Sequence, residues 1–158
     1  MLSRRIAFIT IALTASVTVG FQIAGGAATR LPAALQDSSG VRSVWDGVYS
    51  DEQATRGKDE YEYNCGNCHI HDLSGDSIKD VPPLATNDFL SKWYGKSVKE
   101  LLDYITQNMP QDSRGSLGAK TYADVTAYIL KTNMFPAGAQ PLADSPALAS
   151  IVIEREKK

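Results

Sequence analysis

The chain has 158 residues, of which 43% are hydrophobic and 22% are charged, so it is not a wholly disordered protein. This length suffices for one domain with extensions and is too short for two ordinary domains. The 16 basic and 18 acidic side chains give a net charge of −2, which argues against a nucleic-acid partner because such proteins carry a basic face. The two cysteines are too few for a disulfide-rich scaffold or a four-cysteine zinc site.

The N-terminus has the pattern of an export signal. Arg4 and Arg5 precede an apolar run that ends in small residues near Gly26, which predicts a signal peptide over residues 1–28. A run of about 20 apolar residues is also long enough to cross a bilayer. The alternative is therefore an uncleaved anchor formed by residues 6–25, with a buried core helix as a third interpretation. Both main interpretations place the remaining chain in the periplasm, with membrane contact only if this segment is retained.

The remaining chain divides into three parts. Residues 29–47 are predicted to be a linker because proline, glycine and serine interrupt any regular period, although Trp45 is expected to pack on the domain. Residues 48–135 are predicted to form that domain. Residues 136–158 are predicted to be an extended tail, in which three prolines limit helix to short pieces. The last five residues are all charged, so we expect them to be solvated.

A first helix is predicted over residues 51–64. Ser50 can cap its start, and Gln53 stands at the position that completes a capping box. Three residues at helical spacing are expected to line its buried stripe: Ala54, Gly57 and Tyr61.

Two more helices and one short helical turn are predicted further along the chain. Ser97 and Glu100 form a second capping box, and the helix that they start is expected to end before Pro110. A third helix is expected at about residues 121–132. The short helical turn is expected after Thr86, at about residues 87–92. No segment alternates with the period of a strand. The inward-facing residues are predicted to be Leu101, Leu102, Ile105, Val125, Tyr128 and Ile129.

These elements predict an all-α domain of three to four helices with long loops. Such a domain has a thin apolar core for its size, so we expect another group to fill its centre.

Both cysteines lie in one pentapeptide, Cys65-Gly66-Asn67-Cys68-His69. The C-x-x-C-H spacing is typical of c-type haem attachment, because two thiols add to the two vinyl groups and the histidine then lies under the iron. Three alternatives carry less weight. A thioredoxin-like redox pair needs a βαβ setting, a zinc site needs four ligands, and a disulfide after export competes with haem attachment. The motif therefore predicts one haem c, held through Cys65 and Cys68.

His69 is the predicted proximal ligand of the iron. His71 is too close in sequence to reach the opposite face and is expected to be exposed or near a propionate. Met109 and Met134 remain for the sixth position, with an open or replaced site as the third alternative. Met109 is favoured because Pro110 ends the preceding helix and stiffens the chain there. The alternative is that Met109 only fills a gap in the hydrophobic core.

Over residues 48–135 the chain resembles the class I c-type cytochromes. The resemblance rests on four segments: Cys65–His69, Pro82-Pro83-Leu84, Met109-Pro110 and Asp124-Val125-Thr126-Ala127-Tyr128-Ile129-Leu130. It implies a class I cytochrome c-like fold around one covalent haem. It also implies that the first and last helices cross where Gly57 and Tyr61 meet Val125 and Tyr128.

The same resemblance implies roles for three further residues. Pro82 and Leu84 would lie beside the proximal histidine, and the Pro82 carbonyl would accept the Nδ1 proton of His69 and orient the ring. Trp93 resembles the ring that hydrogen-bonds a haem propionate, with an ordinary core aromatic as the equal alternative.

The function implied is single-electron transfer by a protein that is not itself an enzyme. Two alternatives stay open. One is a haem-bearing relay subunit of a larger dehydrogenase or respiratory complex, and the other is a five-coordinate haem enzyme or gas binder if Met109 does not bind. The segments Trp45–Ser50 and Met109–Gln111 also resemble cytochromes that accompany periplasmic quinoprotein dehydrogenases. This implies such an enzyme as electron donor and a terminal oxidase or another cytochrome as acceptor.

Overall fold

A computed structural model describes residues 40–157 of the chain. The predicted leader, the linker up to residue 39 and Lys158 lie outside the described residues. In the described part, no helix combines the length and apolar character needed to cross a membrane.

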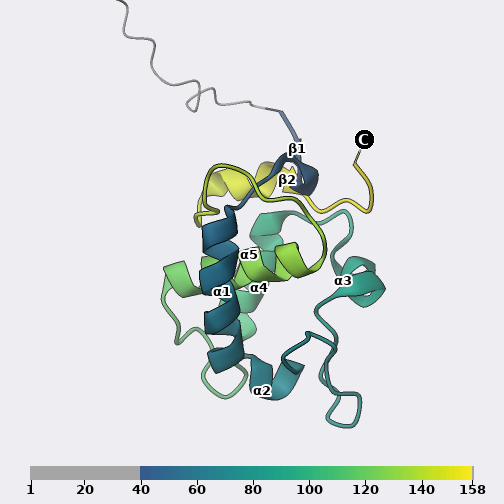
Figure 1. The fold of residues 1–158 in the computed structure, drawn as a ribbon, viewed down its shortest axis with the longest axis vertical. Helices are drawn as coiled ribbons and strands as arrows, with labels where there is room; N and C mark the ends of the chain where they lie inside the picture. The colour runs from purple at the N-terminus through teal and green to yellow at the C-terminus, as the bar shows by residue number, and fades with distance from the viewer. Residues whose placement is uncertain (1–39, 158) are drawn as a thin grey trace, which may run out of the picture. The chain divides into compact units, whose positions relative to one another are not determined.

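Helices dominate the described residues, with little sheet (Figure 1). The all-α prediction is confirmed, and the three long helices and the short helix after residue 85 are all present. The sequence did not predict the single helical turn Gly66–His69 or the two-residue strands Arg42–Ser43 and Ile151–Val152. In chain order the elements are β1 (Arg42–Ser43), η2 (Val44–Asp46), α1 (Asp51–Asn64), α2 (Gly66–His69), α3 (Thr86–Trp93), α4 (Val98–Asn108), α5 (Ala119–Thr132), η3 (Pro146–Ser150) and β2 (Ile151–Val152).

The two predicted capping boxes differ in outcome. At α4 the box is complete, with Glu100 Oε2 2.7 Å from the Ser97 nitrogen and Ser97 Oγ 3.2 Å from the Glu100 nitrogen. At α1, Ser50 Oγ accepts from the Gln53 N–H, but the other half of the box was predicted wrongly. The Gln53 amide is buried and instead exchanges two hydrogen bonds with the backbone of Leu142, at 2.7 and 2.6 Å.

Helices α1 and α5 cross at the point that the resemblance implied (Figure 1). A Cβ atom placed on Gly57 would lie 1.8 Å from the carbonyl oxygen of Asp124, so the two backbones touch here and only glycine fits. One turn further along α1, the rings of Tyr61 and Tyr128 pack with their centroids 5.3 Å apart. Val125 is buried in the same interface.

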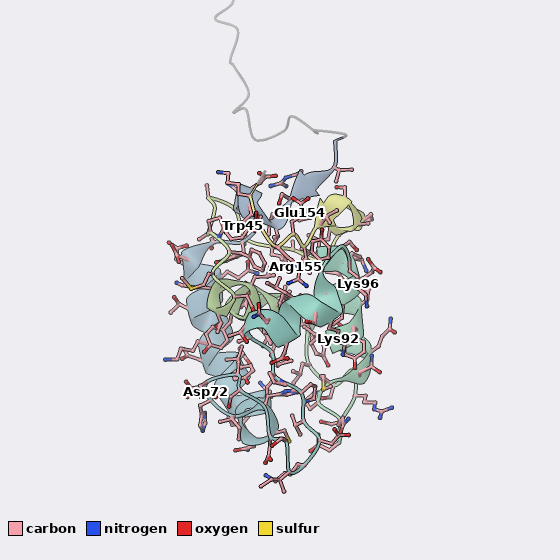
Figure 2. All side chains as sticks on the ribbon, turned by 90° about the vertical axis from the view of Figure 1, so that its right-hand side faces the viewer. Trp45, Asp72, Lys92, Lys96, Glu154 and Arg155 are labelled. Carbon is pink, nitrogen blue, oxygen red and sulfur yellow. The ribbon has the colours of Figure 1, made fainter. Side chains whose placement is uncertain are left out.

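The segments that flank the expected domain pack into the same core. β1 and β2 pair in parallel, with Arg42 opposite Ile151 and Ser43 opposite Val152. The Trp45 indole donates to the Glu154 carbonyl at 3.1 Å, and Figure 2 labels the two residues side by side. The tail forms a short helix and an extended wrap, as predicted, and it contributes four buried side chains: Leu142, Leu148, Ile151 and Ile153. Residues 155–157 are exposed as expected, whereas Glu154 is only partly exposed.

Candidate haem-binding site

The C-x-x-C-H motif occupies the junction between α1 and α2. Cys65 caps the end of α1, with its N–H 2.8 Å from the Tyr61 carbonyl oxygen. The Cys65 carbonyl then accepts from Cys68 and His69 at 3.1 and 2.9 Å. This single turn brings both thiols and the imidazole to one end of α1. Burial, followed by the charges of Cys68 and Glu60, raises the pKa of the Cys65 thiol to about 11.

The imidazole of His69 is buried and held in one orientation. Its Nδ1 lies 3.0 Å from the Pro82 carbonyl oxygen, and the residue is only 6% exposed. A carbonyl can only accept a hydrogen bond, so Nδ1 carries the proton and Nε2 keeps its lone pair. Burial lowers the pKa of His69 despite this hydrogen bond, which favours the neutral ring that binds metals. The hydrogen bond is the one that the resemblance implied, while the role of Pro82 toward a haem stays a prediction.

The loop between His69 and Leu84 folds back on itself to bring Pro82 to the imidazole. Gly75 N–H donates to the His69 carbonyl at 3.0 Å, and the Tyr61 hydroxyl donates to the Ile70 carbonyl at 2.7 Å. A Cβ on Gly75 would lie 2.5 Å from the Val81 carbonyl oxygen, and its φ is +71°, so the tight return of the loop requires glycine. Three other residues of this loop also have positive φ, namely Ile70, Leu73 and Asp80.

Met109 caps the C-terminus of α4, and hydrogen bonds hold both its N–H and its carbonyl. Its N–H lies 2.9 Å from the Ile105 carbonyl oxygen, and its own carbonyl accepts from the Tyr122 hydroxyl at 2.8 Å. The side chain is partly buried against the core, and the peptide bond to Pro110 is cis. Tyr122, which the sequence analysis missed, therefore ties the backbone of Met109 to α5.

The chemistry of these groups suits a covalent haem. Two thiols and a neutral imidazole lie within one helical turn, and a thioether on a fixed backbone is available from the end of α4. These are the groups that hold a haem c in proteins.

The family comparison agrees. Residues 52–129 match the family model described as cytochrome C oxidase, cbb3-type, subunit III. Residues 52–129 are a c-type cytochrome domain. Comparison with curated proteins and with solved structures gave no match. As a cytochrome domain, it is an electron-transfer module that works through haem.

Trp93 lies on α3 of this cytochrome in a cationic setting. It is buried, and it packs edge-on against Tyr104 with the ring centroids 5.4 Å apart. The ammonium groups of Lys92 and Lys96 lie 5.4 and 5.1 Å from its ring centroid, and Figure 2 shows both lysines on this side of the molecule. Contact of Trp93 with a propionate stays a prediction.

The other candidate ligands of the cytochrome lie at the surface. The His71 side chain is 68% exposed, as expected, with Nδ1 3.8 Å from a Glu62 carboxylate oxygen. Met134 is 80% exposed.

Leu84 is partly buried against the core, and its carbonyl accepts from the Asn133 amide at 2.9 Å. Asn133 was not singled out by the sequence analysis, although an asparagine at a helix C-terminus is a capping signal.

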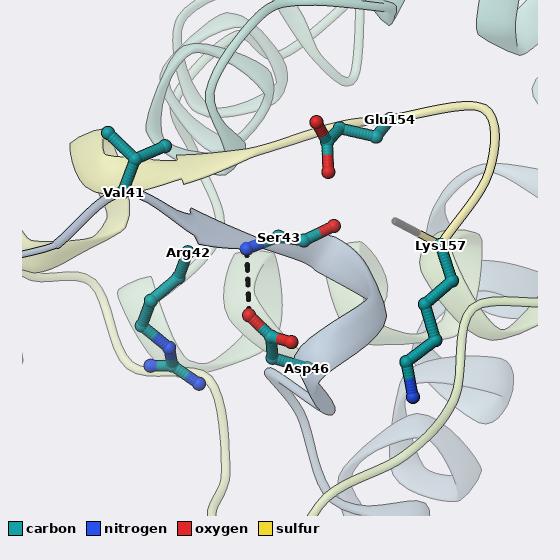
Figure 3. Close-up of a pocket in the computed structure, with 6 residues that line it drawn as sticks. All are labelled: Val41, Arg42, Ser43, Asp46, Glu154 and Lys157. Atoms are coloured by element: carbon teal, nitrogen blue, oxygen red, sulfur yellow. Dashed lines mark hydrogen bonds between the residues drawn. The ribbon is translucent and has the colours of Figure 1, made fainter.

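A shallow pocket of about 360 Å³ lies between β1, η2 and the residues after β2 (Figure 3). None of its lining residues belongs to the predicted haem site. They are Val41, Arg42, Ser43, Asp46, Glu154 and Lys157.

Proposed function

We propose that this cytochrome is a single-electron carrier with one haem c attached through Cys65 and Cys68 and with His69 and Met109 as axial ligands. The observation that carries the proposal is the His69 imidazole. It is buried one turn after Cys65, and its Nδ1 proton is directed at the Pro82 carbonyl. This arrangement leaves Nε2 as the coordinating atom.

The surrounding residues explain why such a site favours electron transfer. When bound, the haem supplies an iron that gains or loses one electron. The Pro82 carbonyl restricts rotation of the His69 ring and increases its basicity. Met109 has a backbone fixed by Ile105 and Tyr122, and a neutral thioether ligand raises the reduction potential. If His69 and Met109 both bound the iron, no position would be left for a substrate, as a carrier requires.

Covalent attachment is tested by the mass and the visible spectrum of the exported protein. We expect the wild-type chain to carry the mass of one haem and to show a redox-dependent spectrum. Replacing Cys65 and Cys68 by serine should remove the covalent haem and most of the folded population, because the haem would fill the centre of the domain. Asn67→Ser is the matched control, since residue 67 is exposed and the C-x-x-C-H spacing is kept. A wild-type protein without haem mass would contradict the proposal.

We further propose a periplasmic location, with a quinoprotein dehydrogenase as donor and a terminal oxidase or another cytochrome as acceptor. The N-terminal pattern and the resemblance of residues 45–50 and 109–111 support it. The test mixes the oxidised cytochrome with a purified quinoprotein dehydrogenase and its substrate. We expect rapid haem reduction, and a rate no greater than that with free substrate alone would reject this donor. The mass of the mature chain shows whether residues 1–28 are removed.

A second candidate is a haem-bearing relay subunit of a larger complex. The matching family is described as an oxidase subunit, which favours this alternative over a gas binder. Purification at native expression distinguishes the two candidates. A free carrier elutes at the mass of one chain, whereas a relay subunit elutes with partners at a defined ratio.

A further inference from the structure

We propose that Asn133 is a positioning residue that holds the segment Pro82-Pro83-Leu84 and, through it, the imidazole of His69. The inference rests on the proposed function, in which His69 binds the iron.

The Asn133 amide joins the last turn of α5 to the segment beside His69. Its Nδ2 donates to the Ile129 carbonyl and to the Leu84 carbonyl, each at 2.9 Å. Both neighbours are carbonyl oxygens, so the NH₂ group of the amide must face them. Asn133 thus connects two parts of the chain that are 49 positions apart.

Leu84 is the natural anchor for the segment. Pro82 and Pro83 have no N–H to donate, so Leu84 provides the only backbone donor of the three. Its N–H lies 2.9 Å from the Leu73 carbonyl oxygen, and its carbonyl is bound by Asn133. The position of the Pro82 carbonyl therefore depends on these two hydrogen bonds and on the pairing of Asp76 with Val81 just before it.

The two ends of the Asn133 amide differ in their contacts. Among residues 40–157, its Oδ1 is the buried side-chain atom that has no hydrogen-bond partner. An apolar side chain of similar size would keep the packing but leave the Leu84 carbonyl without this donor. The gain from Asn133 lies in its NH₂ group, which reaches Leu84.

The test uses Asn133→Leu in the full chain with haem attached. We expect the His69 Nδ1 proton of the reduced protein, followed by NMR, to exchange with solvent about tenfold faster or more, because its acceptor is less well held. We also expect a higher midpoint potential, since a weaker hydrogen bond lowers the basicity of the imidazole. The thermal midpoint should fall only as far as one lost side-chain hydrogen bond accounts for. Asn133→Gln, which keeps an amide donor, should restore most of both properties.

Thr132→Ala is the matched control. It removes a side-chain hydrogen bond to a carbonyl four residues earlier, at 3.0 Å, from the same helical turn. Wild-type exchange and potential in Asn133→Leu, or equal changes in Thr132→Ala, would overturn the inference while the proposed function stands. A wild-type chain without haem would overturn both.

Discussion

Met109 and Met134 are the two methionines among the described residues, and the surroundings of their side chains differ. Met109 is partly buried, with its N–H bonded to Ile105 in α4 and its carbonyl bonded to Tyr122 in α5. Met134 is 80% exposed, and its backbone has a φ of +67°. The Met134 side chain lies in solvent whereas the Met109 side chain packs against the core, so burial favours Met109 as the candidate sixth ligand.

Replacing Met109 by alanine is expected to lower the midpoint potential and to let the reduced protein bind carbon monoxide, because the sixth position becomes open. The long-wavelength sulfur-to-iron band of the oxidised protein should disappear as well. Visible spectroscopy with and without carbon monoxide, together with a redox titration, measures all three effects.

Met134→Ala serves as the control and should leave the spectrum and potential at wild-type values. An unchanged potential in Met109→Ala would assign the sixth ligand elsewhere.

At the scale of elements, the crossing of α1 and α5 depends on the missing side chain at Gly57. The nearest atom of α5 is a backbone oxygen, which cannot move aside as a flexible side chain could. The two helices must therefore separate to admit even one methyl group.

Gly57→Ala is expected to lower the free energy of unfolding by about 3 kcal/mol or more, because overpacking here displaces a backbone. Gly118→Ala is the control, since a Cβ at Gly118 would meet nothing within 4 Å, and should cost under about 1 kcal/mol. Denaturant unfolding of the haem-loaded proteins compares them. Equal effects of the two substitutions would show that the helices do not touch at Gly57.

The same pair of helices shares a buried carboxylate. The Asp124 side chain is 2% exposed, and its two oxygens accept from the Arg56 guanidinium at 3.0 and 3.2 Å. Burial raises the pKa of Asp124, but hydrogen bonds from Arg56, Lys120 and Gln53 together lower it by more. The pKa of Asp124 therefore lies below the ordinary 3.8. A carboxyl whose pKa is lower in the folded state stabilises the fold above its unfolded pKa and loses that contribution as the pH falls.

We therefore expect the wild-type protein to lose stability progressively below about pH 4. Asp124→Asn should be less stable than wild type at pH 7 and should show a flatter pH dependence over the acidic range. Thermal unfolding at a series of pH values measures both curves. Parallel curves for the two proteins would mean that Asp124 does not contribute to the acid transition.

For the whole molecule, the segments before and after the helical domain complete its core. β1 and β2 join residues more than 100 positions apart, and Gln53 on α1 fixes the backbone of Leu142. The tail side chains Leu148 and Ile153 are buried as fully as those of the helices. The apolar surface that a short helical domain lacks is thus supplied in part by its own extensions.

Ile153→Ala is expected to lower the free energy of unfolding by about 2–5 kcal/mol, through lost burial and the cavity left behind. Ile78→Ala is the control of identical chemistry, because Ile78 is 96% exposed, and should change it by less than about 0.5 kcal/mol. Chemical denaturation gives both values. A small effect of Ile153→Ala would mean that the tail is not part of the cooperative unit.

Local signals in the sequence were enough for the helices and for the attachment motif. The boundaries of α1 were predicted from Ser50 and from the spacing of Ala54, Gly57 and Tyr61, all within one segment. The C-x-x-C-H motif likewise carries its chemistry within five residues. The hydrogen bond between His69 and Pro82 was predicted only through the resemblance to a family, because no local pattern links the two residues.

Only the tertiary structure showed what distant residues do to one another. Nothing near Gln53 in sequence distinguishes a helix cap from a buried amide that binds Leu142, and nothing near Asn133 points to Leu84. The pairing of β1 with β2 is likewise invisible locally, since two-residue strands are too short to show a period. Such contacts depend on where the packed helices leave room for a backbone to approach. The sequence by itself therefore determined the longer helices and the C-x-x-C-H motif, and the packing of the loops and tail decided what holds that motif in place.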